Sequence, residues 1–166
     1  MLFMKRWKLS TKGKQAFSVA FVALTLLFIV LLFALKENIA QMASKMVKAQ
    51  AGSDIQNSES AFVDSLFNYS ENGLNYEITF LEFGAKGCSA CKRMESVMED
   101  VRVKYPDRVN VVFVNILLPE NRRLMKYFGV VAIPRQVLLN TEGQEFFRHT
   151  GFIGTKELSV NFTLNH

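Results

Sequence analysis

The sequence contains few of the residues that build metal centres and disulfide frameworks. Its 166 residues include two cysteines and two histidines. The cysteines, Cys88 and Cys91, are too few and too close together to staple distant segments. A disulfide between them would close a very small loop and add little stability through chain entropy. The pair is therefore predicted to function by breaking and forming its disulfide bond.

A basic face that could follow a nucleic-acid backbone is also missing from most of the chain. The formal net charge is +5, but it is unevenly distributed. Residues 1–53 carry eight Lys or Arg and one acidic residue, whereas residues 54–166 carry twelve Lys or Arg and fourteen Asp or Glu. The larger part of the chain is therefore slightly acidic, and we expect no nucleic-acid partner.

One long stretch without charge lies near the N-terminus. Residues 15–35 consist mostly of Phe, Leu, Val, Ala and Ile, and as a helix they would span about 30 Å, the thickness of the hydrocarbon core of a bilayer. Only basic charges precede this stretch. It is predicted to be a transmembrane helix, with 1–14 as a cytoplasmic tail and the C-terminal part periplasmic or extracellular. A cleaved signal peptide is the alternative, but its apolar region is usually shorter, and the Ala-x-Ala sequence at 49–51 lies far downstream.

The rest of the chain divides into a polar tether, 36–57, and one domain, 58–166. The segments expected to form helices are 60–69, 89–105, 119–128 and 155–161, and those expected to form strands are 78–83, 109–115, 136–139 and 144–149. The Val-rich segment 109–115 has little polar alternation, which is typical of a central strand covered on both faces. A strand-helix-strand unit followed by a hairpin predicts an α/β domain with a mixed sheet and helices on both faces.

The two cysteines stand where a helix is expected to begin. A predicted strand ends at Phe83, a glycine-rich loop covers 84–87, and Cys88 and Cys91 open an amphipathic helix. Unpaired N–H groups and a partial positive charge at a helix N-terminus favour a thiolate, so Cys88 is predicted to be the nucleophile. Cys91 lies one helical turn later and can attack a mixed disulfide that Cys88 forms with a partner. It is predicted to be the resolving thiol.

Other uses of a Cys-x-x-Cys pair stay open at this point. A zinc site needs two further nitrogen or sulfur ligands, and only His149 and His166 are available, far apart in the sequence. Covalent haem attachment needs a histidine directly after the second cysteine, where Lys92 stands. Two inert buried cysteines are the remaining alternative. Redox chemistry of the pair, without a metal or another cofactor, is the favoured interpretation.

Two segments resemble the signatures of the thioredoxin superfamily. Phe80–Lys92, FLEFGAKGCSACK, resembles its active-site stretch, and Ile133-Pro134 resembles its second signature. The similarity runs from about Ser60 to Phe162 and is especially to membrane-anchored extracytoplasmic domains, such as the C-terminal domain of transmembrane thiol:disulfide interchange proteins. The resemblance implies a thioredoxin-like three-layer fold with a mixed central sheet and thiol-disulfide oxidoreductase activity, in the direction of reduction.

The resemblance also implies roles for individual residues. Pro134 should follow a cis peptide bond and face the cysteines, which leaves the backbone of Ile133 to pair with an extended partner chain. Glu82 occupies the place of a buried acid beneath the second cysteine. Two-residue alternation puts Glu82 on an apolar face of its strand, where burial would suit it to accept a proton from Cys91. An exposed glutamate on an edge strand is the alternative.

The residues beside the cysteines are predicted to contact the partner protein. These are Gly87, Ser89 and Ala90. Gly87 stands where many family members have Trp, so the aromatic wall beside the nucleophile is missing. The expected partners are cysteine-containing proteins and a membrane-bound or thioredoxin-like electron donor. A noncatalytic assembly or metal-handling factor with the same fold is the alternative, and the scarcity of His and Cys argues against it.

Overall fold

The computed structural model describes residues 11–49 and 53–163. The chain divides into two compact units, of which the first ends at Asn38 and the second begins at Ile39. The predicted cytoplasmic tail, 1–14, lies mostly outside the described residues. The boundaries predicted from the sequence for the tail, the tether and the domain stay predictions.

The N-terminal part of the described chain is one helix, α1 (Thr11–Ala49). Its side chains between Phe17 and Leu35 are exposed wherever the structure describes them. Within residues 11–49 and 53–163, no helix is long and apolar enough to cross a membrane. The transmembrane helix expected over 15–35 stays a prediction. The tether expected over 36–57 is helical wherever it is described.

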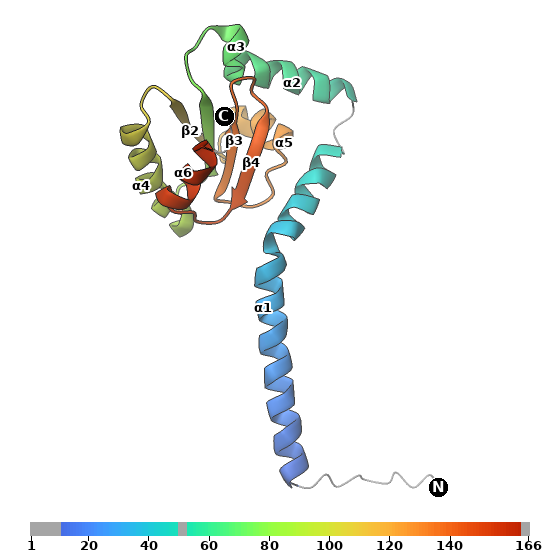
Figure 1. Ribbon diagram of the computed structural model, residues 1–166. Coiled ribbons are helices and arrows are strands. Elements are labelled where there is room, and N and C mark those ends of the chain that lie inside the picture. The colour runs from blue at the N-terminus through green and yellow to red at the C-terminus, as the bar shows by residue number, and fades with distance from the viewer. Residues whose placement is uncertain (1–10, 50–52, 164–166) are drawn as a thin grey trace. The chain divides into compact units, whose positions relative to one another are not determined.

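The second unit is built on a four-stranded sheet (Figure 1). Its strands are β1 (Ile78–Gly84), β2 (Val109–Asn115), β3 (Arg135–Leu139) and β4 (Glu145–Thr150), in the order β2-β1-β3-β4. β1 runs parallel to β2 and antiparallel to β3, and β3 is antiparallel to β4. The sheet is therefore mixed, as the element order predicted.

Helices cover both faces of this sheet (Figure 1). They are α2 (Ser53–Phe67), α3 (Tyr69–Asn72), α4 (Ser89–Lys104), the short 3₁₀ turn Pro119–Asn121, α5 (Arg122–Tyr127) and α6 (Thr155–Thr163). Buried side chains of α4 and α6 pack with Phe80 on one face, and those of α2 and α5 pack with Phe83 on the other. Because side chains alternate along a strand, β1 contributes to both cores. The three-layer α/β arrangement is confirmed.

The position of β2 differs from the prediction. Its Val-rich sequence predicted a central strand, but in the described sheet β2 lies at the edge and pairs with β1 alone. Phe113 in β2 is 41% exposed, whereas all seven residues of β1 are buried. A run of β-branched and aromatic residues favours a strand wherever it lies, and it does not report how many neighbours the strand has. The prediction of a central β2 was therefore wrong, and β1 is the central strand.

The two cysteines lie at one end of the sheet. β1 and β2 finish side by side, where the N–H of Ile116 donates a hydrogen bond to the carbonyl of Gly84 at 2.9 Å. After β1 the chain enters α4, so the two cysteines lie at this end. We call it the cysteine end. The opposite end, where β1 begins at Ile78, is called the far end; six residues of strand separate it from Gly84, or about 20 Å.

Candidate functional site

The two cysteines form a disulfide at the start of α4. Their Cα atoms are 5.2 Å apart. Cys88 is the N-cap residue, and its Sγ accepts a hydrogen bond from the backbone N–H of Cys91 at 3.2 Å. Cys88 is partly buried, whereas Cys91 is only 3% exposed. The more accessible sulfur therefore lies at the positive end of a helix, with an N–H group already directed at it.

Gly84 lies directly beneath Cys91. A Cβ atom at Gly84 would lie 3.3 Å from Cβ of Cys91 and 2.9 Å from the ring of Phe113. Because contacts of 2.9 Å to a Cβ essentially do not occur, a side chain here would displace its neighbours. From the sequence, Gly84 was expected in a loop, and its position beneath Cys91 was not predicted. The available signal was a glycine at the end of an apolar strand, which often marks a close approach of other atoms.

Glu82 is fully buried on the same face of β1 as Gly84. Gln136 lies opposite it on β3 and donates a hydrogen bond from Nε2 to Oε2 of Glu82 at 2.9 Å. The other carboxylate oxygen, Oε1, has no hydrogen-bond partner among the described residues. Burial raises the pKa of Glu82 to about 8, and the hydrogen bond from Gln136 opposes the rise. The predicted burial of Glu82 is confirmed, and the alternative of an exposed edge-strand residue was wrong.

The segment before β3 meets the cysteine end from the other side. The Ile133–Pro134 peptide bond is cis, as the resemblance implied. Pro134 is buried, Ile133 is partly buried, and the carbonyl of Pro134 accepts a hydrogen bond from the N–H of Gly151 at 2.8 Å. The register pairs Phe83 with Arg135, so its continuation by one residue puts Pro134 across from Gly84. The two sequence signatures are thus brought together.

A third segment, the loop after β4, completes this end. The guanidinium of Arg93 in α4 lies over the ring of Phe152, 5.0 Å from its centroid. The guanidinium of the buried Arg135 donates to the hydroxyl of Thr150. These contacts were not predicted from the sequence, because each joins residues from different elements that only the tertiary fold brings together.

The residues predicted to contact a partner surround Cys88. Gly87 and Ser89 are exposed, and Ala90 is partly buried. Gly87 has a φ of +89°, a left-handed conformation that glycine adopts without strain, and open space lies where a side chain would begin. The surface beside the nucleophile is therefore open, without an aromatic wall.

The structure describes one of the two histidines weighed as metal ligands. His149 lies on β4, and His166 is outside the described residues. In the described ranges, no group of three or more His, Cys, Asp or Glu residues is placed to hold a metal ion.

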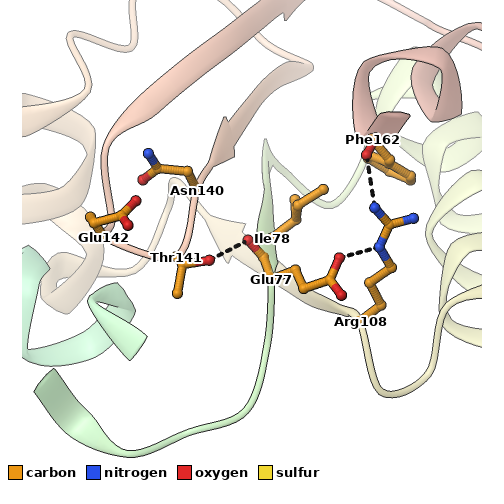
Figure 2. Close-up of a pocket in the computed structure, with 7 residues that line it drawn as sticks. All are labelled: Glu77, Ile78, Arg108, Asn140, Thr141, Glu142 and Phe162. Carbon is orange, nitrogen blue, oxygen red and sulfur yellow. Dashed lines mark hydrogen bonds and ion pairs between the residues drawn. The ribbon is translucent and has the colours of Figure 1, made fainter. Parts of the chain in front are cut away.

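A cavity of about 300 Å³ lies at the far end of the sheet (Figure 2). It is lined by Glu77, Ile78, Arg108, Asn140, Thr141, Glu142 and Phe162. Figure 2 shows that Arg108 pairs with the carboxylate of Glu77 and donates to the carbonyl of Phe162 at 3.1 Å. The hydroxyl of Thr141 donates to the carbonyl of Glu77 at 3.3 Å. These groups bond to one another and join four segments, which indicates a structural role.

Comparisons with known proteins agree with this geometry. The family model described as Thioredoxin matches residues 58–162. The chain is 34% identical over 77 residues to the thioredoxin-like protein HCF164, chloroplastic, of Oryza sativa subsp. japonica, covering 46% of this chain and 29% of the relative. It is 31% identical over 81 residues to the Arabidopsis thaliana protein of the same name, covering 49% and 31%. The matched region thus spans about a third of the length of these relatives.

A solved structure is similar in fold. It is the exposed lipoprotein thioredoxin Etrx1 from Streptococcus pneumoniae, which superposes with a TM-score of 0.50. The match covers 56% of this chain and 88% of that protein, at 18% sequence identity. At this identity the similarity shows the fold alone.

Proposed function

This chain belongs to the thioredoxin family, and we propose that it is a thiol-disulfide oxidoreductase that exchanges disulfides with cysteine-containing proteins. One observation carries the proposal. The pair Cys88–Cys91 is a disulfide at the start of a helix, and the more accessible sulfur receives an N–H group of that helix. A disulfide that closes so small a loop contributes little to stability. Its role therefore lies in being formed and cleaved reversibly.

The exchange proceeds in two displacement steps from the dithiol form. The thiolate of Cys88 attacks one sulfur of the partner's disulfide, a Cys88–partner bond forms, and the partner's other sulfur leaves as a thiolate. Cys91 then loses its proton and attacks the sulfur of Cys88. The Cys88–Cys91 disulfide closes and the second partner sulfur leaves. Two electrons pass to the partner, whose two thiolates take up protons, and a dithiol reductant must then restore the pair.

Glu82 is the candidate acceptor for the proton of Cys91. Gly84 lies directly under Cys91, two residues after Glu82 on the same face of β1. The carboxyl group of Glu82 therefore belongs to the position next to the one beneath the buried sulfur. Oε1 of Glu82 has no hydrogen-bond partner among the described residues, so it is available to accept a proton directly or through one water, as a general base does. A pKa of about 8 leaves the carboxyl group able both to take up and to release a proton near neutral pH.

Net reduction is the direction that the resemblance to electron-delivering domains supports. A membrane-bound or thioredoxin-like donor would supply the electrons. An oxidase or an isomerase would use the same two cysteines, because direction depends on the potential of the pair relative to its surroundings. Measurement of that potential therefore decides the direction.

Turnover of a model disulfide tests the proposed activity. The purified full chain with dithiothreitol should reduce insulin catalytically, and Cys88→Ser should abolish turnover because the attacking thiolate is lost. Cys91→Ser should instead accumulate a mixed disulfide through Cys88. Stoichiometric binding of zinc by the wild-type chain, without turnover, would favour the metal-handling alternative and contradict the proposal.

Attachment to a membrane is a separate part of the proposal, and it rests on the sequence. The 21 uncharged residues 15–35 follow five basic and no acidic residues. Along this stretch the described side chains of α1 are exposed and, apart from Thr25, apolar, including Phe17, Leu24 and Phe28. A helix that is apolar on all sides is stable when buried in protein or in lipid. We therefore propose a single-pass anchor with the N-terminus in the cytoplasm.

Membrane extraction tests the anchor. The wild-type chain should stay with the membrane fraction after an alkaline carbonate wash. Leu24→Lys combined with Phe28→Lys should release it, because each Lys at the centre of a membrane helix costs about 3 kcal/mol. Met42→Lys combined with Met46→Lys is the matched control, with the same spacing on exposed positions of α1. Recovery of the wild-type chain in the soluble fraction would contradict the anchor.

A further inference from the structure

Charge is segregated within the domain. The cysteine end is formed by three segments, 84–94, 129–135 and 148–156, which together contain six Lys or Arg and no Asp or Glu. The other residues of 54–166 carry six Lys or Arg and fourteen Asp or Glu. A domain with a slightly negative total charge thus has a basic end, and that end holds the disulfide.

The three segments form one continuous surface, because contacts join them in pairs. Arg93 stacks on Phe152, which joins the first segment to the third. The N–H of Gly151 donates to the carbonyl of Pro134, which joins the third to the second. The continuation of the β1–β3 register puts Pro134 beside Gly84, which joins the second to the first.

Three of the six basic residues contribute most to the positive field outside the protein. Lys86, Lys92 and Arg93 are exposed, lie within five residues of a cysteine, and form no ion pair with any residue that the structure describes. Arg135 is buried and Arg148 pairs with Glu145, so both contribute less to the field outside the protein.

Acidic residues border this end of the sheet, but they are fewer than the basic residues of the three segments. Glu95 and Glu157 directly follow the first and third segments, and Asp100 accepts a hydrogen bond from the hydroxyl of Thr155 at 2.8 Å. The loop 116–121, which follows β2 at the cysteine end, contains Glu120. Arg122 follows two residues later and balances it. The positive end of α4 adds to the potential around the sulfur of Cys88.

Apolar side chains stand among these charges. Phe152 is 46% exposed and Val131 is 43% exposed, one from each of the two loops that flank the disulfide. An apolar centre with a charged rim is the usual composition of a protein-docking surface. Because the exposed charges within the three segments are all positive, the complementary chain carries negative ones.

We propose that the cysteine end is a docking surface for proteins whose reactive disulfide is flanked by acidic residues. The proposal rests on the proposed oxidoreductase function and names the partner class. Attraction between exposed charges of opposite sign speeds the encounter of the two proteins and is screened by salt. Gly87 leaves the approach to Cys88 open, so contact with the rim decides which partners bind productively.

Three disulfide probes test the docking surface on the reduced full chain. One is neutral 2-hydroxyethyl disulfide, and the others are two synthetic peptides with the same intramolecular disulfide, flanked either by Asp and Glu or by Lys. At low salt we expect kcat/KM for the acidic peptide to exceed that for the basic peptide by about tenfold or more. The difference should fall to within about twofold at high salt, where the Debye length shortens to about 3 Å. Equal rates for the two peptides at low salt would overturn the proposal.

A matched pair of charge reversals on α4 identifies the surface. Lys92 and Lys104 are both exposed, and they lie twelve positions apart on the helix, a rise of about 18 Å. Lys92→Glu should lower kcat/KM for the acidic peptide about three- to tenfold and leave the neutral probe unchanged, whereas Lys104→Glu should change neither. An equal loss for all probes in Lys92→Glu would mean that its charge acts on the thiolate, and would contradict docking.

Failure of the oxidoreductase function is distinguishable from failure of docking. If the wild-type chain does not reduce the neutral probe, the function is wrong. Docking is then judged from equilibrium binding of the two peptides to the oxidised protein, in which no net electron transfer occurs. Tighter binding of the acidic peptide at low salt would support the surface, and equal binding would overturn it.

Discussion

Polar groups at the far end of the sheet bond to one another, whereas several at the cysteine end do not. At the far end, Arg108 pairs with Glu77 and donates to the carbonyl of Phe162. At the cysteine end, Lys92 is exposed without an ion pair among the described residues, and Oε1 of the buried Glu82 lacks a hydrogen bond there. Buried polar atoms without partners are costly, so their presence beside a disulfide indicates use in chemistry rather than in stability.

The largest loss of activity at the cysteine end is expected when the buried carboxyl group of Glu82 is removed. Glu82→Gln should lower the rate of insulin reduction at pH 7 by roughly 100-fold, because a positioned proton acceptor contributes about that much or more. The wild-type rate of mixed-disulfide resolution should rise with pH through about 8, and the variant should lose this rise. Glu95→Gln, an exposed change on α4, is the control. A normal rate and pH profile in Glu82→Gln would remove Glu82 from the mechanism.

The same carboxyl group makes stability depend on pH. The pKa of Glu82 is about 8 in the folded protein and roughly 4.3 when unfolded, so between these values the folded protein holds a proton that the unfolded chain has released. Stability should therefore fall as pH rises from about 4.3 to 8, by at most roughly 1.4 kcal/mol per pH unit. Denaturant unfolding of the oxidised wild type and Glu82→Gln should diverge in this window. Parallel curves would show that burial does not perturb this group.

Filling the space above Gly84 should damage the cysteine end locally. Gly84→Ala puts a methyl group against Cys91 and the Phe113 ring, which we expect to cost about 1–3 kcal/mol, as overpacking does. The redox potential of the pair should also shift, because Cys91 must move. Gly154→Ala, where the added methyl group meets open space, is the matched control. Unchanged stability and potential in Gly84→Ala would argue against close packing of Cys91 on β1.

The smallest effect on activity is expected at the far end. Arg108→Ala removes a hydrogen bond from a charged group to a carbonyl and a partly exposed ion pair, and should lower the free energy of unfolding by about 1–2 kcal/mol. Insulin reduction should stay within about twofold of the wild type. A large loss of activity without loss of stability would show that the far end takes part in exchange.

The sequence predicted the parts of this account that depend on local pattern. The four strands and the helix that begins at Ser89 lie close to their expected positions, because alternation and helical spacing report burial within one element. Burial of Glu82 followed from its two-residue offset from Phe80. These inferences needed no knowledge of which elements are neighbours.

Features that depend on contacts between elements were missed or wrong. The edge position of β2 and the hydrogen bond from Gln136 to Glu82 follow from the strand order and register, which the residue pattern of one strand does not contain. The basic cysteine end was hidden in the same way. Its charges come from three separate segments, and counting them over the domain averages them with the acids elsewhere.

The equilibrium redox potential of Cys88 and Cys91 shows whether the pair cycles between dithiol and disulfide, and in which direction. The full chain is equilibrated with a graded series of oxidised and reduced dithiothreitol, and the fraction of free thiols is measured by alkylation. We expect one reversible two-electron transition, with a midpoint near −270 mV for a thioredoxin-type reductant. A midpoint near −120 mV would keep the exchange but reverse its direction. A pair that stays fully oxidised or fully reduced across the series would show that Cys88 and Cys91 do not exchange electrons reversibly.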